Sequence, residues 1–167
     1  KSIAIIISWI SSVLLLATFS RNFFPEQKEL NRKIVHIGTG PIIPLAWWLG
    51  IPSKLAIPVA SLITIALVIN RQFRLIPAIE EVNRQSFGTV AYGFSITFLM
   101  IFLWSEHPSA VSAGVLVMAF GDGFAGLIGR KFKSPSWLIF GQRKSVAGTI
   151  TMGGVGLLTL ILVQLIS

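Results

Sequence analysis

The sequence predicts an all-α fold, a polytopic bundle of about six transmembrane helices, and three observations support this. Hydrophobic residues make up 53% of the 167 residues and charged residues 12%, whereas a soluble globular chain carries roughly 25% charged residues. Long apolar runs alternate with polar segments, and a helix needs about 20 residues to cross the hydrocarbon core. The basic residues gather in alternate polar segments, as the positive-inside rule requires. We expect a single membrane-embedded domain over residues 1–167.

Six apolar runs mark the expected spans. They are Ser2–Ser20, Ile34–Leu49, Leu55–Ile69, Gly88–Trp104, Ala110–Ile128 and Val146–Ile166. The first is too long and too Ile-rich for a signal-peptide core, and no small-residue cleavage site follows it. The second and third are short, contain Pro41, Pro44 and Pro58, and flank a turn at Gly50; we therefore expect an antiparallel hairpin whose two helices are either kinked or only partly inserted. Because the chain begins at Lys1 and ends inside an apolar run, the sequence leaves open whether native residues are missing at either end.

We attribute the net charge of +8 to basic loops on one side of the membrane, and not to a surface that binds nucleic acid. If all six runs cross, the odd-numbered loops share one face and hold all the basic residues except Lys1 and Lys54. The positive-inside rule assigns that face to the cytoplasm. Trp47, Trp48 and Trp104 are then expected to form an aromatic belt at the opposite interface. The chain has no Cys, which excludes disulfides, thiol catalysis and Cys-type zinc sites.

Asp122 is the main candidate for chemistry, because it is the only Asp in the chain and lies near the cytoplasmic end of the fifth run. An ionisable residue at the centre of a membrane helix costs at least about 2.5 kcal/mol, and less near an end, so it marks function or a buried partner. A structural ion pair with a nearby Lys or Arg is the alternative interpretation. Asp122, Ala125 and Gly129 share one helical face, where small side chains would let a backbone or a ligand approach the carboxylate.

The segment Gly121–Gly126 matches the dinucleotide-binding pattern G-x-G-x-x-G literally. No strand precedes it and its surroundings are membrane helix, so we reject a dinucleotide-binding fold. Packing of small residues between membrane helices is the simpler interpretation, and it is compatible with a ligand site at the same place.

The fifth loop, Gly129–Ser145, and the helix start that follows it are predicted to bind phosphate. Backbone N–H groups at a helix N-terminus bind phosphate, and Lys and Arg side chains such as Arg143 and Lys144 add charge. Cytoplasmic loops are basic in any case, so the carboxylate of Asp122 upstream is the stronger signal. Magnesium typically uses one or two protein carboxylates together with substrate phosphates.

Two further groups on the basic face could take part. His36, at the start of the second run, could orient phosphate or accept a hydroxyl proton, or could be an ordinary hydrogen-bonded interfacial side chain. The third loop contributes four polar residues that could complete a metal shell or simply be solvated, namely Glu80, Glu81, Asn83 and Arg84.

Three separated motifs on this face resemble the polyprenol kinase family, the CTP-dependent phytol and dolichol kinases. Arg32–His36 resembles the opening signature of the family, and Asn83–Thr89 its middle loop. Gly121–Arg130, followed by Lys144–Thr149, is similar to its nucleotide-site region, whose elements are shared more distantly with CDP-diacylglycerol synthases. Val146-Ala147 stands where cytidylyltransferase-like members tend to carry Trp-Glu, which favours the kinase branch.

The resemblance implies CTP-dependent phosphorylation of an isoprenoid alcohol such as phytol, as in tocopherol biosynthesis, in a cyanobacterial or plastid-type membrane. It implies that Asp122 holds Mg²⁺ on the triphosphate and that His36 or Glu81 orients or deprotonates the alcohol. The nucleotide site would comprise Lys33, Asn83, Arg84, Gly129, Arg130, Arg143, Lys144, Ser145 and Gly148.

Two alternatives remain open, a cytidylyltransferase acting on a lipid phosphate and a small transporter. The clustering of polar residues on one face, without an internal repeat, weighs against a transporter.

Overall fold

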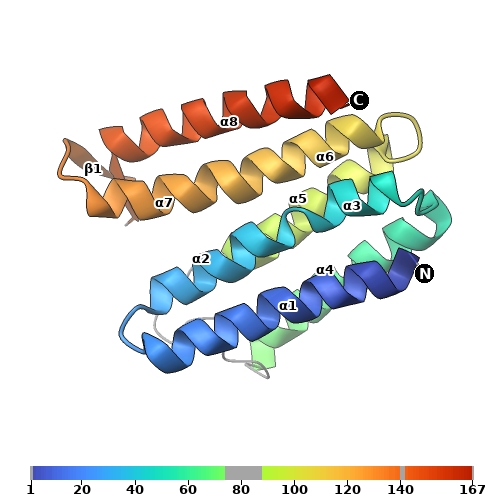
Figure 1. Ribbon diagram of the computed structural model, residues 1–167, viewed down its shortest axis with the longest axis horizontal. Helices are drawn as coiled ribbons and strands as arrows, with labels where there is room; N and C mark the ends of the chain where they lie inside the picture. Colours follow the sequence, from blue (N-terminus) through green and yellow to red (C-terminus); the bar gives the residue numbers. More distant parts are fainter. Residues whose placement is uncertain (1, 74–87, 140–141, 167) are drawn as a thin grey trace.

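A computed structural model describes residues 2–73, 88–139 and 142–166. Its helices run back and forth between two ends of the molecule, and both termini lie at the same end (Figure 1). In chain order the helices are α1 (Ser2–Phe23), α2 (Lys28–Thr39), α3 (Ile42–Trp48), α4 (Ser53–Phe73), α5 (Gly88–Leu103), α6 (Pro108–Leu116), the π-helical turn η1 (Val117–Gly121), α7 (Asp122–Lys131) and α8 (Val146–Ile166).

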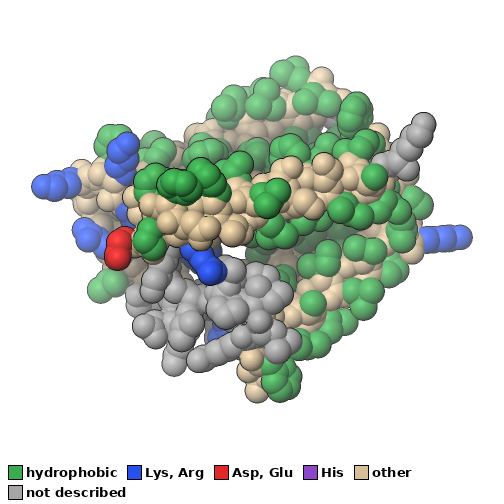
Figure 2. Space-filling model, turned by 60° about the horizontal axis from the view of Figure 1, so that its bottom comes forward, with side chains coloured by type: hydrophobic (Ala, Val, Ile, Leu, Met, Phe, Trp, Pro, Cys, Tyr) green, Lys and Arg blue, Asp and Glu red, His purple; other side chains and the backbone are tan. Residues whose placement is uncertain are grey.

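The prediction of an all-α membrane bundle is confirmed. Among the described helices, α1, α4, the continuous α6–η1–α7 segment and α8 are long and apolar enough to cross a membrane, and α5 is a shorter apolar helix. Large hydrophobic side chains cover the outer surface of these helices. In Figure 2 the hydrophobic groups lie over the flanks of the bundle, and most of the visible Lys and Arg groups lie toward one end. Such an exterior suits contact with lipid instead of water.

Proline and glycine set the ends of the helices. The helix α1 ends at Phe23, two residues before Pro25. Proline lacks an N–H and restricts the residue before it, so the helix does not continue through this position. Gly40-Pro41 separates α2 from α3, and Gly50, whose φ is +65°, forms the turn before α4. The second span is therefore divided into two helices at Gly40-Pro41. Pro58 lies inside α4 without ending that helix.

The second span begins earlier than its apolar run, because α2 starts at Lys28 and not near Ile34. Polar and apolar residues alternate along α2 with a helical period, so one face is apolar and the other carries charge. Lys33 and His36 consequently lie within a helix, one turn apart, instead of at its edge.

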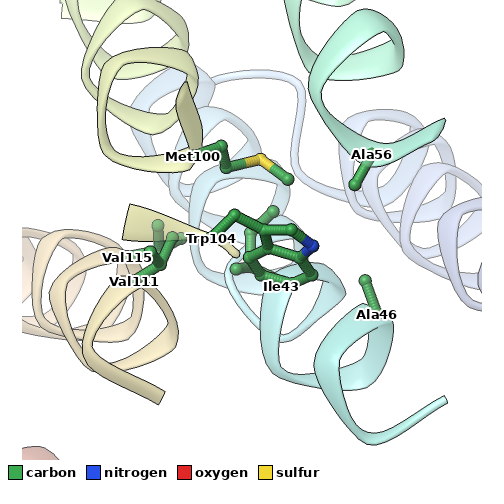
Figure 3. Close-up of a cluster of buried hydrophobic side chains, with 7 residues drawn as sticks. All are labelled: Ile43, Ala46, Ala56, Met100, Trp104, Val111 and Val115. Atoms are coloured by element: carbon green, nitrogen blue, oxygen red, sulfur yellow. The ribbon is translucent and has the colours of Figure 1, made fainter. Parts of the chain in front are cut away.

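The buried core lies at the end of the bundle away from α7. It gathers side chains from α3, α4, α5 and α6 (Figure 3), namely Ile43, Ala46, Ala56, Met100, Trp104, Val111 and Val115. Trp104 is 4% exposed and its indole Nε1 donates to the Ile51 carbonyl at 3.2 Å. The prediction that Trp104 belongs to an interfacial belt is therefore wrong, because this side chain fills the core. Trp48, by contrast, is 81% exposed.

The fifth loop is more ordered than the sequence indicated. It contains an antiparallel hairpin formed by β1 (Ser136–Ile139) and β2 (Gln142–Ser145). In this register Trp137 pairs with Lys144 and Leu138 with Arg143. The hairpin leads directly into α8, so it fixes the direction in which that helix begins.

Candidate active site

The π-helical turn η1 interrupts the α6–α7 segment directly before Asp122. A π-turn adds one residue to a helix, so the side chains that follow are rotated by about 100° relative to an uninterrupted α-helix. Such turns are frequent at functional sites. Here the turn determines which neighbour Asp122 faces, and that neighbour is α2.

Small residues let α2 approach η1 and α7 closely. A Cβ added at Gly40 would lie 2.5 Å from the Ala119 Cβ, and one added at Gly123 would overlap the Ile37 side chain. A Cβ at Gly121 would meet the Met152 sulfur of α8 at 2.7 Å. The glycines of the G-x-G-x-x-G segment thus serve helix packing, as the simpler interpretation predicted, and this packing brings the charged side chains of α2 to Asp122.

Lys33 and Asp122 form an ion pair at the centre of this contact. The Lys33 ammonium donates to Asp122 Oδ2 at 2.6 Å and to the Asp122 main-chain carbonyl at 3.0 Å. The Lys33 side chain is 6% exposed, whereas the Asp122 side chain is 57% exposed. The ion pair that the sequence left as an alternative is therefore present. It does not enclose the carboxylate, which keeps an open side for a ligand.

His36 lies beside the same carboxylate. Its Nε2 is 3.2 Å from the main-chain carbonyl of Met118, inside η1, and 3.6 Å from Asp122 Oδ2. Since a carbonyl can only accept, Nε2 carries the hydrogen, and in a neutral ring Nδ1 is then the atom able to take a proton. The Tyr92 ring of α5 packs against His36 with centroids 4.4 Å apart.

Tyr92 was missed by the sequence reasoning. It is the only Tyr in the chain and stands four residues after Gly88, at the predicted basic end of the fourth run. Its position near the polar end of an apolar run could have indicated a place in the site, because tyrosine favours positions where one end of its ring is apolar and the other polar.

The helix start of α8 is occupied by hydrogen bonds within the chain. The Ser145 hydroxyl donates to the Gly129 carbonyl at 3.2 Å and accepts the Gly148 N–H at 3.2 Å, so Ser145 is the N-cap of α8. The Val146 N–H donates to the Pro135 carbonyl. A further hydrogen bond joins the Ala147 N–H to the Ser134 hydroxyl.

These bonds bear on the predicted phosphate site. Gly129, Ser145 and Gly148 form a close junction between α7 and α8, in which a Cβ at Gly129 would meet the Ser145 hydroxyl at 2.7 Å. The first N–H groups of α8 already have partners within the chain, so a phosphate group in this region would have to contact side chains instead of the free N–H groups that the sequence suggested.

Among the basic side chains, Lys144 is exposed and interacts electrostatically with Asp122. Arg143 donates from Nε to the Ser136 hydroxyl at 3.0 Å, and Arg130 is exposed near the end of α7. Direct contacts among the described residues of the predicted site therefore bring together Lys33, His36 and Asp122, and Lys144 adds an electrostatic interaction with the carboxylate. The predicted residues Glu80, Glu81, Asn83 and Arg84 lie outside the described residues.

A preformed metal cage is absent from the described ranges, where no three His, Asp or Glu side chains converge. A single half-exposed carboxylate nevertheless fits Mg²⁺, which usually keeps several waters and binds through one or two carboxylates plus substrate phosphates. The residues present thus suit an ion that arrives with a nucleotide.

Comparison with known proteins identifies relatives. The chain is 36% identical over 146 residues to a phytol kinase of Synechocystis, an alignment that covers 87% of this chain and 63% of that protein. It is 32% identical over 138 residues to a chloroplast phytol kinase of Arabidopsis thaliana, covering 75% and 45%. It is also 29% identical over 143 residues to a chloroplast farnesol kinase of the same plant, covering 78% and 46%.

The chain thus spans about half to two thirds of the length of these relatives. No family model and no solved structure matches it. These relatives, which are named phytol and farnesol kinases, support the resemblance to the polyprenol kinase family that the three motifs carry.

Proposed function

We propose that this chain phosphorylates an isoprenoid lipid alcohol at the basic end of the bundle. The observation that carries the proposal is the half-exposed carboxylate of Asp122, which pairs with Lys33, lies beside His36 and interacts electrostatically with Lys144, in a relative of phytol and farnesol kinases. An alcohol of this class can keep its tail among apolar helices while its hydroxyl reaches the polar end. A nucleoside triphosphate, with CTP the donor that the family resemblance favours, would approach from the water side.

Phosphoryl transfer depends on positioning and charge neutralisation more than on covalent help from the protein. In the reaction the alcohol oxygen bonds to the γ-phosphorus, the bond from that phosphorus to the bridging oxygen breaks, and the nucleoside diphosphate leaves. Asp122 would hold the Mg²⁺ that accompanies the triphosphate, and that ion would spread the developing negative charge. Lys144, which is exposed and interacts electrostatically with the carboxylate, would bind phosphate oxygens as a point charge.

His36 is suited to receive the proton of the alcohol. Its Nε2–H is fixed by the Met118 carbonyl, which leaves Nδ1 as the atom able to accept a proton. The Tyr92 ring restricts the orientation of the imidazole. The basic face, following the positive-inside rule, would be the cytoplasmic or stromal side of a cyanobacterial or plastid-type membrane.

Purified protein in lipid nanodiscs tests the proposal. We would supply CTP, ATP or UTP labelled in the γ-phosphate, together with phytol, farnesol, geranylgeraniol or a longer polyprenol, and then identify the products. The expected result is a labelled lipid monophosphate and an unlabelled nucleoside diphosphate. A parallel assay supplies a lipid phosphate in place of the alcohol, and release of pyrophosphate with formation of a CDP-lipid there would indicate a cytidylyltransferase instead. Substrate flux into proteoliposomes without nucleotide would indicate a transporter.

A further inference from the structure

Gly126 stands one turn after Asp122 on α7 and faces the Lys33 side chain across the α2–α7 contact. A Cβ built at Gly126 would lie 2.8 Å from Lys33 Cε and 3.1 Å from Lys33 Nζ. Both distances are too short for ordinary contact, so the Lys33 chain runs through space that any side chain at this position would fill. The absence of a side chain at Gly126 is what allows the buried ammonium to reach Asp122.

We infer that Gly126 is a positioning residue of the candidate active site, which acts through Lys33 on the Asp122 carboxylate. The inference rests on the proposed function for its catalytic consequence. Lys33 clamps Asp122 at two points, the Oδ2 atom and the main-chain carbonyl. This clamp restricts the rotamer of the carboxylate, and the Asp122 side chain stays 57% exposed, so a nucleotide-borne cation could still reach it.

The neighbouring glycines have different surroundings, which makes the inference specific. At Gly123, one turn before Gly126, an added Cβ meets the apolar Ile37 side chain. At Gly153 on α8 it meets nothing within 4 Å. Of these three positions, Gly126 is the one at which an added methyl group displaces a charge. The displaced atoms are the far end of a flexible side chain, so the helices themselves can stay in place.

The test compares Gly126→Ala with Gly123→Ala and Gly153→Ala, each in the wild-type and in a Lys33→Met background. Melting temperatures are measured first, on purified protein without substrate. We expect Gly126→Ala to lower the melting temperature when Lys33 is present. In the Lys33→Met background it should have little further effect, because the ion pair is then already lost and the uncharged, flexible Met side chain can leave the space that the added Cβ fills. Gly123→Ala should lower the melting temperature equally in both backgrounds, and Gly153→Ala should leave it unchanged or raise it.

Kinetics in nanodiscs give the second readout. Gly126→Ala should reduce kcat/KM about tenfold or more and raise the Mg²⁺ concentration needed for half-maximal rate, whereas Gly153→Ala should change neither. The inference is overturned if Gly126→Ala behaves like Gly153→Ala, or if its melting shift is the same in both backgrounds, which would mark a packing role. If the wild-type protein phosphorylates no alcohol, the proposed function fails, but the melting comparison still decides whether Gly126 positions Lys33.

Discussion

Replacing Asp122 by Asn distinguishes a structural role of this carboxylate from a role in the reaction. Asparagine keeps the shape of the side chain and one oxygen that can accept from Lys33, but it removes the negative charge. A hydrogen bond to a charged group contributes about 1.5–3 kcal/mol and a neutral one about 0.5–1.5 kcal/mol. The exchange should therefore cost about 1–1.5 kcal/mol of stability.

The structure supports this low value for two reasons. Removing one partner of a fully buried ion pair costs about 3–5 kcal/mol, but the Asp122 side chain is 57% exposed and the pair is partly screened by water. In the variant, the Lys33 ammonium also keeps its hydrogen bond to the main-chain carbonyl of residue 122, which is 3.0 Å long in the wild-type structure. Asp122→Asn should consequently insert, purify and melt within a few degrees of the wild-type protein.

Activity should respond much more strongly, because the neutral amide is a poor ligand for Mg²⁺. We expect Asp122→Asn to lose more than about a hundredfold in phosphoryl transfer, equivalent to roughly 2.7 kcal/mol, measured as label transferred to the lipid alcohol over a range of Mg²⁺ concentrations. Glu106→Gln, which removes an exposed carboxylate in the α5–α6 connection, serves as the matched control and should keep normal activity. A stable Asp122→Asn protein with near-normal rates at every Mg²⁺ concentration would refute the metal role and most of the mechanism.

The remaining predictions concern the hairpin, the imidazole, the cap and the topology. Lys144→Ala should raise the nucleotide KM and lower kcat/KM by roughly tenfold to 150-fold; unchanged steady-state kinetics would leave Lys144 as an ordinary cytoplasmic charge. His36→Gln can still donate a hydrogen bond from its side-chain amide, so it should melt like wild type yet lose kcat, and a fully active variant would remove His36 as proton acceptor. Ser145→Ala should cost about 1 kcal/mol of stability through loss of the cap without altering nucleotide KM, as melting and kinetics together would show. Cysteines at Ser134 and Ser53 should be labelled from opposite sides of the membrane; labelling from one side would contradict the predicted topology.

Much of the fold was predictable because apolar runs of membrane length directly indicate helices. The last span, Val146–Ile166, has the same bounds in the structure. The second span was set too short, because α2 begins in a charged segment whose helical period hydropathy alone does not show. The hairpin was missed because its strands are four residues each and their pairing depends on contacts and not on composition.

The site was predicted as a set of residue types but not as an arrangement. Asp122 stood out because a carboxylate in an apolar run is costly, and His36 because it follows a basic pair. Their meeting with Lys33 depends on η1, and one extra residue inside a helix leaves no mark in an apolar sequence. The predicted anion site at the start of α8 overlooked the Ser134 hydroxyl, whose role depends on how the hairpin folds back.

The π-helical turn also has a consequence for how this chain can tolerate insertions and deletions. Removing one residue between Val117 and Gly121 would leave a regular apolar helix of nearly the same length, still able to enter a bilayer. Everything beyond the deletion would turn by about 100° and shift by about 1.5 Å, which would carry Asp122 away from α2. Hydropathy would be almost unchanged while the ion pair was lost, so a relative with a gap of one residue at this turn should still insert into the membrane but lack the Lys33–Asp122 pair on which the proposed activity depends.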